Sequence, residues 1–424
     1  MDGQLGGFPF WTVSFDEQGA DPAPLAAELG GQGVTDLFVL AHGWNSDRAM
    51  ALALYRDFFE ALRGALDQGG LSPEGIGVAG ALWPSMRWAD EAAPAGVAAA
   101  RAAPRDDGAL VRQLQAVYHA PAERQALDEL AQLLATRPAD PAALLRFQQL
   151  MAPLTGHPDA AAAAEDDGES GLLTVPPEQV YETLAGALPS RRRAAEAAFA
   201  NPFGRWWDGA KEALRQATYW QMKKRAGTVG QQGLGPLLAR LRQDQPALRC
   251  HLIGHSFGAR LVSFAAAAQP PGSSPVRSVL LLQGAFSHFA FAPALPWDRS
   301  RAGALGGTPA RVGGPLLVSH SLHDLAVGQL YPLASSLARD DASILGNLLF
   351  RWGAMGHDGA QAVGAAAATL GPVGQRYQFP AGAVTNLDAN AVIAKGGPPA
   401  GAHSDIVHPE LGWAVLAAAG RAVR

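Results

Sequence analysis

The sequence is poor in cysteine, poor in charge and free of long hydrophobic runs. Its 424 residues include one cysteine, Cys250, which excludes an intramolecular disulfide and a cysteine-based metal cluster. We interpret Cys250 as a small core residue, because it lies in a short apolar segment. No stretch offers about 20 uninterrupted apolar residues, so we expect no transmembrane segment.

Clusters of basic residues are absent as well. The 33 Lys and Arg residues are outnumbered by 38 Asp and Glu residues, and the formal net charge is -5. The chain therefore lacks the basic field by which proteins attract nucleic acid or an anionic membrane surface. We expect a small or neutral substrate and no nucleic-acid partner. Without a recognisable signal segment the chain is predicted to be cytoplasmic; the alternative is a secreted protein whose signal peptide has been removed.

Apolar segments typical of buried strands alternate with helical segments at both ends of the chain. A helix is predicted at 46–66, capped by Ser46 or Asp47. Such alternation indicates a mostly parallel sheet with helices on both faces. The predicted strands are 35–44, 75–84, 249–254, 278–286, 314–324 and 381–393.

Residues 101–224 interrupt this alternation with helical segments and no evident strand. Apolar residues recur there three or four positions apart, and a loose acidic segment occupies 155–171. We interpret this region as a helical insertion, with a partner-binding subdomain as the alternative. Its aromatic residues are more often core than pocket, yet they are the first that we would place near a bound acyl or alkyl group. They are Trp206, Trp207, Tyr219 and Trp220.

A serine between two glycines stands where a predicted strand meets a predicted helix. In "LRCHLIGHSFGARLVS" (248–263), Ser256 lies between Gly254 and Gly258. With 49 glycines in the chain, this spacing arises easily by chance, so the context has to decide. A serine in so tight a strand-to-helix turn needs small neighbours, and the two glycines provide them.

This arrangement resembles the nucleophile elbow of the α/β-hydrolase superfamily, to which serine esterases and lipases belong. The resemblance implies Ser256 as nucleophile, followed along the chain by an acid and then a histidine base, each on a loop after a strand. Asp324, at the carboxyl end of the predicted strand 314–324, matches the acid. His403, in the Gly/Pro-rich loop after the last strand, matches the base.

Other residues compete for these two roles. His408 precedes Pro409 and is expected at the start of the closing helix, which favours His403 as the base. The competing acids are Asp340, Asp341, Asp388 and Asp405, which we expect in a helix, in the last strand or too near His403 in sequence. His320, His323 and Asp324 also have a spacing that metal ligands use, but no second cluster matches it, so we expect no metal.

The resemblance also implies an oxyanion hole. The family often carries a His-Gly pair after the first long strand, and this chain has "LAHGWNS" with His42 and Gly43 there. The backbone amides of Trp44 and Phe257 would then face the developing negative oxygen of a tetrahedral intermediate.

Together these motifs predict an α/β-hydrolase core at 1–100 and 225–424, with a helical cap at 101–224. The expected activity is hydrolysis of carboxylic esters through an acyl-enzyme, with no cofactor. An amidase or peptidase would use the same three residues, and a non-catalytic interaction protein using the helical insertion is the alternative from another class.

Overall fold

The structure is a computed structural model of the 424-residue chain. It describes residues 2–20, 31–44, 46–85, 117–155, 176–187, 202–327, 353–397 and 400–422, together with Leu25, Leu29 and residues 110–111 and 114–115. Asp340, Asp341 and nearly all of the acidic segment at 155–171 lie outside these residues.

The chain divides into two compact units. One comprises Met1–Ser85, Lys223–Tyr331 and Gly353–Arg424, and the other comprises Met86–Met222 and Pro332–Trp352. The described part of the first unit is an α/β structure, and the described elements of the second are helices. The interpretation of 101–224 as a cap over the core stays a prediction.

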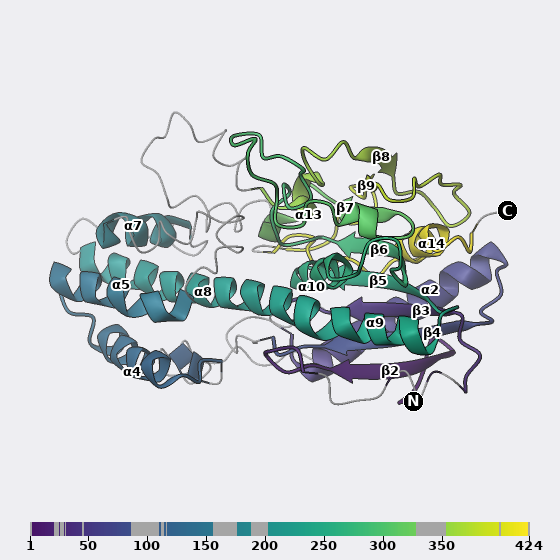
Figure 1. Cartoon of the computed structure of the whole chain (residues 1–424). Helices are drawn as coiled ribbons and strands as arrows, with labels where there is room; N and C mark the ends of the chain where they lie inside the picture. Colours follow the sequence, from purple (N-terminus) through teal and green to yellow (C-terminus); the bar gives the residue numbers. More distant parts are fainter. Residues whose placement is uncertain are drawn as a thin grey trace. The chain divides into compact units, whose positions relative to one another are not determined.

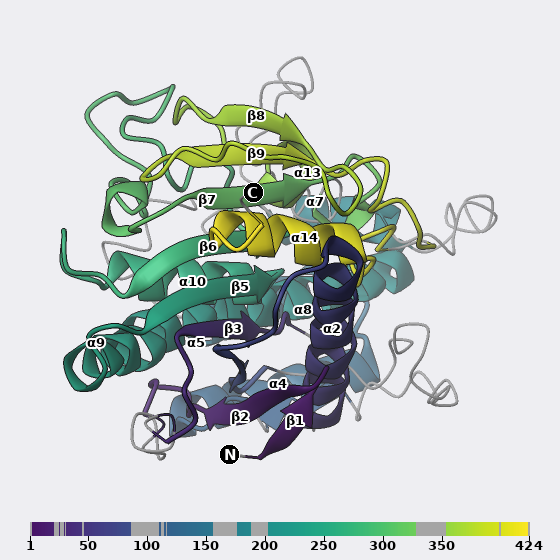
Figure 2. The same ribbon diagram turned by 90° about the vertical axis from the view of Figure 1, so that its right-hand side faces the viewer.

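The first unit is built on a nine-stranded sheet of order β1-β2-β4-β3-β5-β6-β7-β9-β8 (Figure 2). Among the strands that the structure describes, only the β1–β2 pair is antiparallel, so the predicted mostly parallel α/β sheet is confirmed. The carboxyl ends of the central strands are in register, with Ala41 opposite Gly254 and Gly254 opposite Leu281. The strands are β1 (Gly3–Leu5), β2 (Phe8–Ser14), β3 (Asp36–Ala41), β4 (Ile76–Leu82), β5 (Arg249–His255), β6 (Val276–Leu282), β7 (Leu316–His320), β8 (Ala366–Thr369) and β9 (Val384–Asp388).

Helices cover both faces of this sheet (Figure 2). On one face α2 (Arg48–Gly69) packs against α14 (Pro409–Ala418), and their apolar side chains share a buried cluster with Phe38 and Leu40 of β3. The other face is covered by α10 (Phe257–Ala267) and α9 (Gly235–Asp244), which continues from the π-helical turn η3 (Gly230–Leu234). Of the two predicted caps of α2, Asp47 is the one used: its Oδ1 accepts from the amide of Met50 at 2.9 Å.

The helical unit contains α4 (Pro121–Thr136), α5 (Pro141–Thr155), α7 (Pro177–Ala187) and most of α8 (Pro202–Val229). Helix α5 contacts both α4 and α7 (Figure 1). Trp207 packs edge-on against Phe147 with ring centroids 5.6 Å apart, and its indole N–H donates to the Pro138 carbonyl. None of the helices that the structure describes is both long enough and apolar enough to span a bilayer.

Two edge regions of the sheet were not predicted. Strands β1 and β2 extend one edge, and β8 forms the other edge through its pairing with β9. The sequence of β8 is AAAT, and alanine has no strand preference of its own. Pairing with β9, rather than local propensity, therefore defines this strand.

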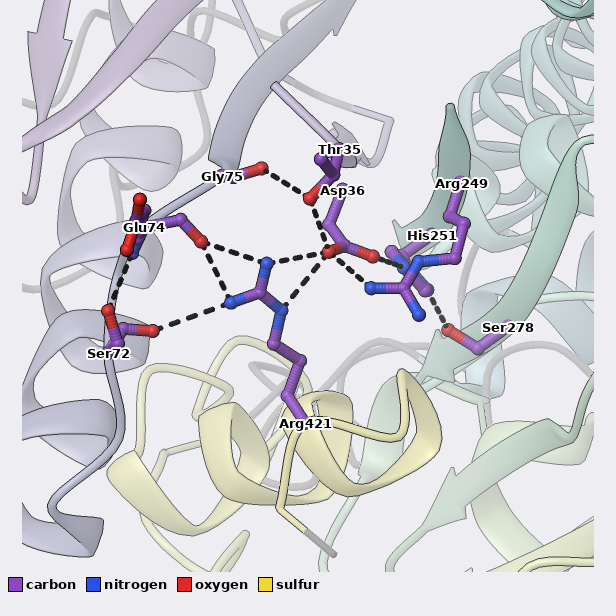
Figure 3. Close-up of polar contacts among 9 residues, drawn as sticks. All are labelled: Thr35, Asp36, Ser72, Glu74, Gly75, Arg249, His251, Ser278 and Arg421. Atoms are coloured by element: carbon purple, nitrogen blue, oxygen red, sulfur yellow. Dashed lines mark hydrogen bonds and ion pairs between the residues drawn. The ribbon is translucent and has the colours of Figure 1, made fainter. Parts of the chain in front are cut away.

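A buried carboxylate joins strands β3 and β5 to the end of the chain (Figure 3). Asp36 is fully buried, and its Oδ2 accepts from Arg249 at 2.6 Å and from Arg421 at 2.7 Å. Its Oδ1 contacts His251 Nε2 at 3.0 Å. Although burial alone raises the pKa of Asp36, the hydrogen bonds from His251 and the two arginines outweigh it and hold the pKa below its ordinary value. This network ties the segment after α14 to the amino ends of the strands.

Candidate active site

Ser256 occupies a strained turn between β5 and α10. It follows His255, the last residue of β5, and precedes Phe257, the first residue of α10, with φ 57° and ψ -119°. A side chain at Gly258 would place its Cβ 2.1 Å from the carbonyl oxygen of Ala41, so only glycine fits there. Ser256 therefore lies in a tight turn between a strand and a helix, as the sequence predicted.

Three predicted residues form one chain of hydrogen bonds. His403 Nε2 lies 2.9 Å from Ser256 Oγ, and His403 Nδ1 lies 2.8 Å from Asp324 Oδ2. Asp324 is fully buried, whereas the His403 side chain is 14% exposed. The distances fit a tautomer of the imidazole that donates from Nδ1 to the carboxylate and accepts from the serine hydroxyl at Nε2.

Backbone pairing between two loops brings the acid and the histidine together. Asp324 and Gly401 form an isolated antiparallel bridge. The amide of Ala402 donates to the His323 carbonyl at 2.9 Å, and the amide of Ala326 donates to the Ala400 carbonyl at 3.1 Å. The loop after β7 and the loop before α14 are thus held as a short two-stranded pair, which fixes the spacing of Asp324 and His403.

His255 supports His403 from the strand side, a role that the sequence analysis missed. Its Nε2 lies 2.9 Å from the His403 carbonyl oxygen, and the two imidazole rings are 5.0 Å apart. Burial lowers the pKa of His255 to about 3, so it is neutral and donates from Nε2. The sequence places a histidine directly before Ser256 in the GHSFG motif. No motif could show that its partner is a backbone oxygen.

The loop after β3 lies directly beside Ser256. A Cβ at Gly43 would lie 2.8 Å from the Cβ of Ser256. His42 holds this loop: its Nδ1 donates to the Gly43 carbonyl at 2.9 Å, and its Nε2 accepts from the Trp83 amide at 3.3 Å. Burial lowers the pKa of His42 to about 4, consistent with this neutral tautomer.

The two residues predicted for the oxyanion hole are neighbours. The rings of Trp44 and Phe257 lie 6.0 Å apart, centroid to centroid. Their backbones belong to the loop after β3 and to the first turn of α10, the two segments that flank Ser256. Gly43, which precedes Trp44, approaches Ser256 closely, so both segments lie beside the serine. An oxyanion hole formed by their amides stays a prediction.

The competing residues have other partners. Asp405 accepts from the amides of Ala394 and Lys395 and contacts His408 Nε2 at 2.9 Å. His408 directly precedes α14, as predicted. Asp388 is the last residue of β9 and accepts from the amide of Asn390. Among the described residues, no group of three or more His, Cys, Asp or Glu side chains is arranged to hold a metal ion.

The tryptophans predicted to contact substrate lie in α8. Trp207 and Trp220 are buried, and Trp206 is half-buried with its ring against Phe203. The contacts of Trp207 with Phe147 and Pro138 make it a core residue of the helical unit. A role of these three residues in substrate binding stays a prediction.

A second Asp–His–Ser set lies at the opposite end of the sheet (Figure 3). His251 joins Asp36 through Nε2 and Ser278 Oγ through Nδ1, at 3.0 Å and 2.8 Å. Burial lowers the pKa of His251, and all three side chains are inaccessible. Ser278 lies within the regular strand β6 rather than in a turn. The same residue types are therefore present without a strained turn and without access for a substrate.

The site around Ser256 thus combines a serine hydroxyl in contact with a histidine, a buried carboxylate on the other side of that histidine and two flanking backbone segments. Comparisons of this chain with protein-family models, with curated proteins and with solved structures return no match.

Proposed function

We propose that the protein is a serine hydrolase with an α/β-hydrolase fold that cleaves carboxylic esters without a cofactor. The observation that carries the proposal is the hydrogen-bonded chain from Ser256 Oγ through His403 to Asp324, which begins at a residue with a positive φ. Strained backbone at a nucleophile is a feature of such elbows. The parallel sheet and the loops at its carboxyl end also support the proposal.

In the first half of the reaction Ser256 Oγ attacks the ester carbonyl carbon while His403 Nε2 takes the hydroxyl proton. The carbonyl oxygen becomes an oxyanion facing the amides of Trp44 and Phe257. The bond from carbon to the alcohol oxygen then breaks, and the imidazolium of His403 returns its proton to that oxygen. The alcohol leaves, and the acyl group remains on Ser256.

In the second half a water molecule attacks the acyl carbon and His403 takes one of its protons. The Ser256–acyl bond breaks, the carboxylic acid leaves, and the proton returns to Ser256 Oγ. Asp324 stays ionised throughout and holds the Nδ1–H tautomer of His403, which keeps Nε2 free to accept each proton.

Covalent labelling tests the nucleophile directly. A fluorophosphonate probe should label the wild-type protein on Ser256, and Ser256→Ala should abolish both labelling and the hydrolysis of nitrophenyl esters. Ser278→Ala is the matched control, because it removes the serine of the second Asp–His–Ser set and should leave labelling intact. Labelling that persists in Ser256→Ala, or turnover above a few per cent of wild type, would overturn the proposal.

A substrate panel separates esters from amides. Nitrophenyl esters of increasing acyl length, assayed beside the matching anilides, should show turnover of the esters well above that of the anilides. Faster cleavage of the anilides would assign the same three residues to an amidase or peptidase.

A further inference from the structure

A buried glutamine contacts the acid of the proposed triad. Gln283 follows β6 directly and is fully buried. Its Nε2 lies 3.0 Å from Asp324 Oδ2, the same oxygen that accepts from His403 Nδ1, and 2.9 Å from the Gly356 carbonyl oxygen. Each of the two amide hydrogens therefore has its own acceptor.

The other end of this amide is held as well. Ser319 Oγ lies 3.1 Å from Gln283 Oε1 and accepts from the Gln283 backbone amide at 3.4 Å. Rotating the amide by 180° would turn Oε1 toward the Asp324 carboxylate and the Gly356 carbonyl, leaving buried acceptors facing one another. The orientation with Nε2 toward Asp324 is thus the one that satisfies every polar atom of the side chain.

The backbone around Gln283 is also shaped for this contact. Gln283 has φ 47°, in the left-handed region that non-glycine residues rarely occupy. Gly356, in the short helix α13 (Met355–Asp358), approaches so closely that a Cβ there would lie 2.5 Å from the Gln283 carbonyl carbon. The left-handed backbone and the close approach of Gly356 accompany the two hydrogen bonds that the side chain donates, to Asp324 and to Gly356.

We propose that Gln283 is a positioning residue for the reaction, acting through Asp324. This inference rests on the proposed function. Three donors among the described residues contact the Asp324 carboxylate: His403 Nδ1 and Gln283 Nε2 on Oδ2, and the Val327 amide on Oδ1 at 3.2 Å. Gln283 blocks rotation of the carboxylate away from the imidazole, and its donated hydrogen bond favours the ionised form that must stabilise the imidazolium.

The first test compares two buried glutamines of the same unit. Gln283→Leu should lower kcat for nitrophenyl esters by roughly 10- to 100-fold with KM within about twofold, because Gln283 orients the reacting groups without binding substrate. Gln269→Leu is the matched control: Gln269 is equally buried and donates from Nε2 to the carbonyls of Gly235 and Ala265. It should lose stability while keeping kcat within about twofold of wild type.

A second variant gives a signature that lost packing cannot mimic. In Gln283→Glu the new carboxyl group lies against Asp324, so it donates to Asp324 only when protonated and repels it when ionised. The ratio of variant to wild-type kcat should therefore fall as the pH rises. If Gln283→Leu does not fold, this pH profile carries the test alone.

The outcomes separate the two proposals. Wild-type protein that neither reacts with fluorophosphonate at Ser256 nor hydrolyses esters would overturn the proposed function. If wild type is active and Ser256→Ala is inactive, but Gln283→Leu retains as much kcat as Gln269→Leu, or the Gln283→Glu ratio does not change with pH, only the positioning role fails.

Discussion

Replacing Ser256 by glycine should give a more stable protein than replacing it by alanine. Ser256 has φ 57° and ψ -119°, and a non-glycine residue in such a conformation costs on the order of 1–3 kcal/mol. Alanine retains this cost, whereas glycine removes it. Glycine also lowers the free energy of unfolding by about 0.4–1 kcal/mol, because it gives the unfolded chain more conformational entropy. The free energy of unfolding of Ser256→Gly should therefore exceed that of Ser256→Ala by about 1 kcal/mol.

Ser263 provides the control for this comparison. It lies within α10, is fully buried, and donates from Oγ to the Ala259 carbonyl at 2.7 Å. At an ordinary helical position glycine is about 1 kcal/mol less stable than alanine. The sign of the glycine-minus-alanine difference should thus reverse between positions 256 and 263.

Thermal unfolding of the four variants under identical conditions measures the difference. A change of 1 kcal/mol shifts Tm by about 2–4 °C in a unit of this size. Both variants at position 256 should be inactive toward esters, because both lack the hydroxyl. If Ser256→Gly melts below Ser256→Ala, as expected for position 263, the turn does not store the strain inferred from its backbone angles.

Three further predictions concern the acid, the pH dependence and the buried network. Asp324→Asn should lower kcat by roughly 10⁴-fold, because the amide favours the wrong imidazole tautomer. Asp388→Asn should lower kcat less than about tenfold; a larger loss for Asp388→Asn than for Asp324→Asn would assign the acid to Asp388. Burial lowers the pKa of His42 to about 4 and that of His255 to about 3, against an ordinary value of 6.5, so below that value the unfolded chain binds protons that the folded protein excludes. The free energy of unfolding should therefore fall as the pH drops from about 6.5 toward 4. The decrease should be up to about 1.4 kcal/mol per pH unit for each histidine, and about 3 kcal/mol in total for His42. Urea midpoints that do not change between pH 7 and 4.5 would contradict this prediction. Asp36→Asn should lower the free energy of unfolding by about 2–3 kcal/mol, because two partly exposed arginines lose their shared carboxylate. The value of kcat should stay unchanged, since this network lies at the amino ends of the strands. A variant as stable as wild type, or one with reduced kcat, would refute this prediction.

The sequence by itself determined the features that depend on neighbours along the chain. Runs of apolar residues predicted the central strands, because a strand buried on both faces needs apolar side chains throughout. The start of α2 and the turn at Ser256 also followed from local sequence, although the structure selected Asp47 rather than Ser46 as the cap and packs Gly258 against Ala41 of a distant strand. Asp324 and His403 were predicted from the resemblance to the order of acid and base in α/β-hydrolases, and the structure places both in hydrogen-bonding distance of one another.

Only the tertiary structure decided which distant polar groups meet. Gln283 contacts Asp324 from 41 positions away, and His255 contacts the backbone of His403 from 148 positions away. Neither contact has a sequence signal, because a glutamine after a strand and a histidine before a serine are compatible with many partners. The same holds for Asp36, His251 and Ser278, which the register of three strands brings together as a buried structural set. Residue type is a property of the chain, but burial and hydrogen-bond partners arise only when strands far apart in sequence pack side by side.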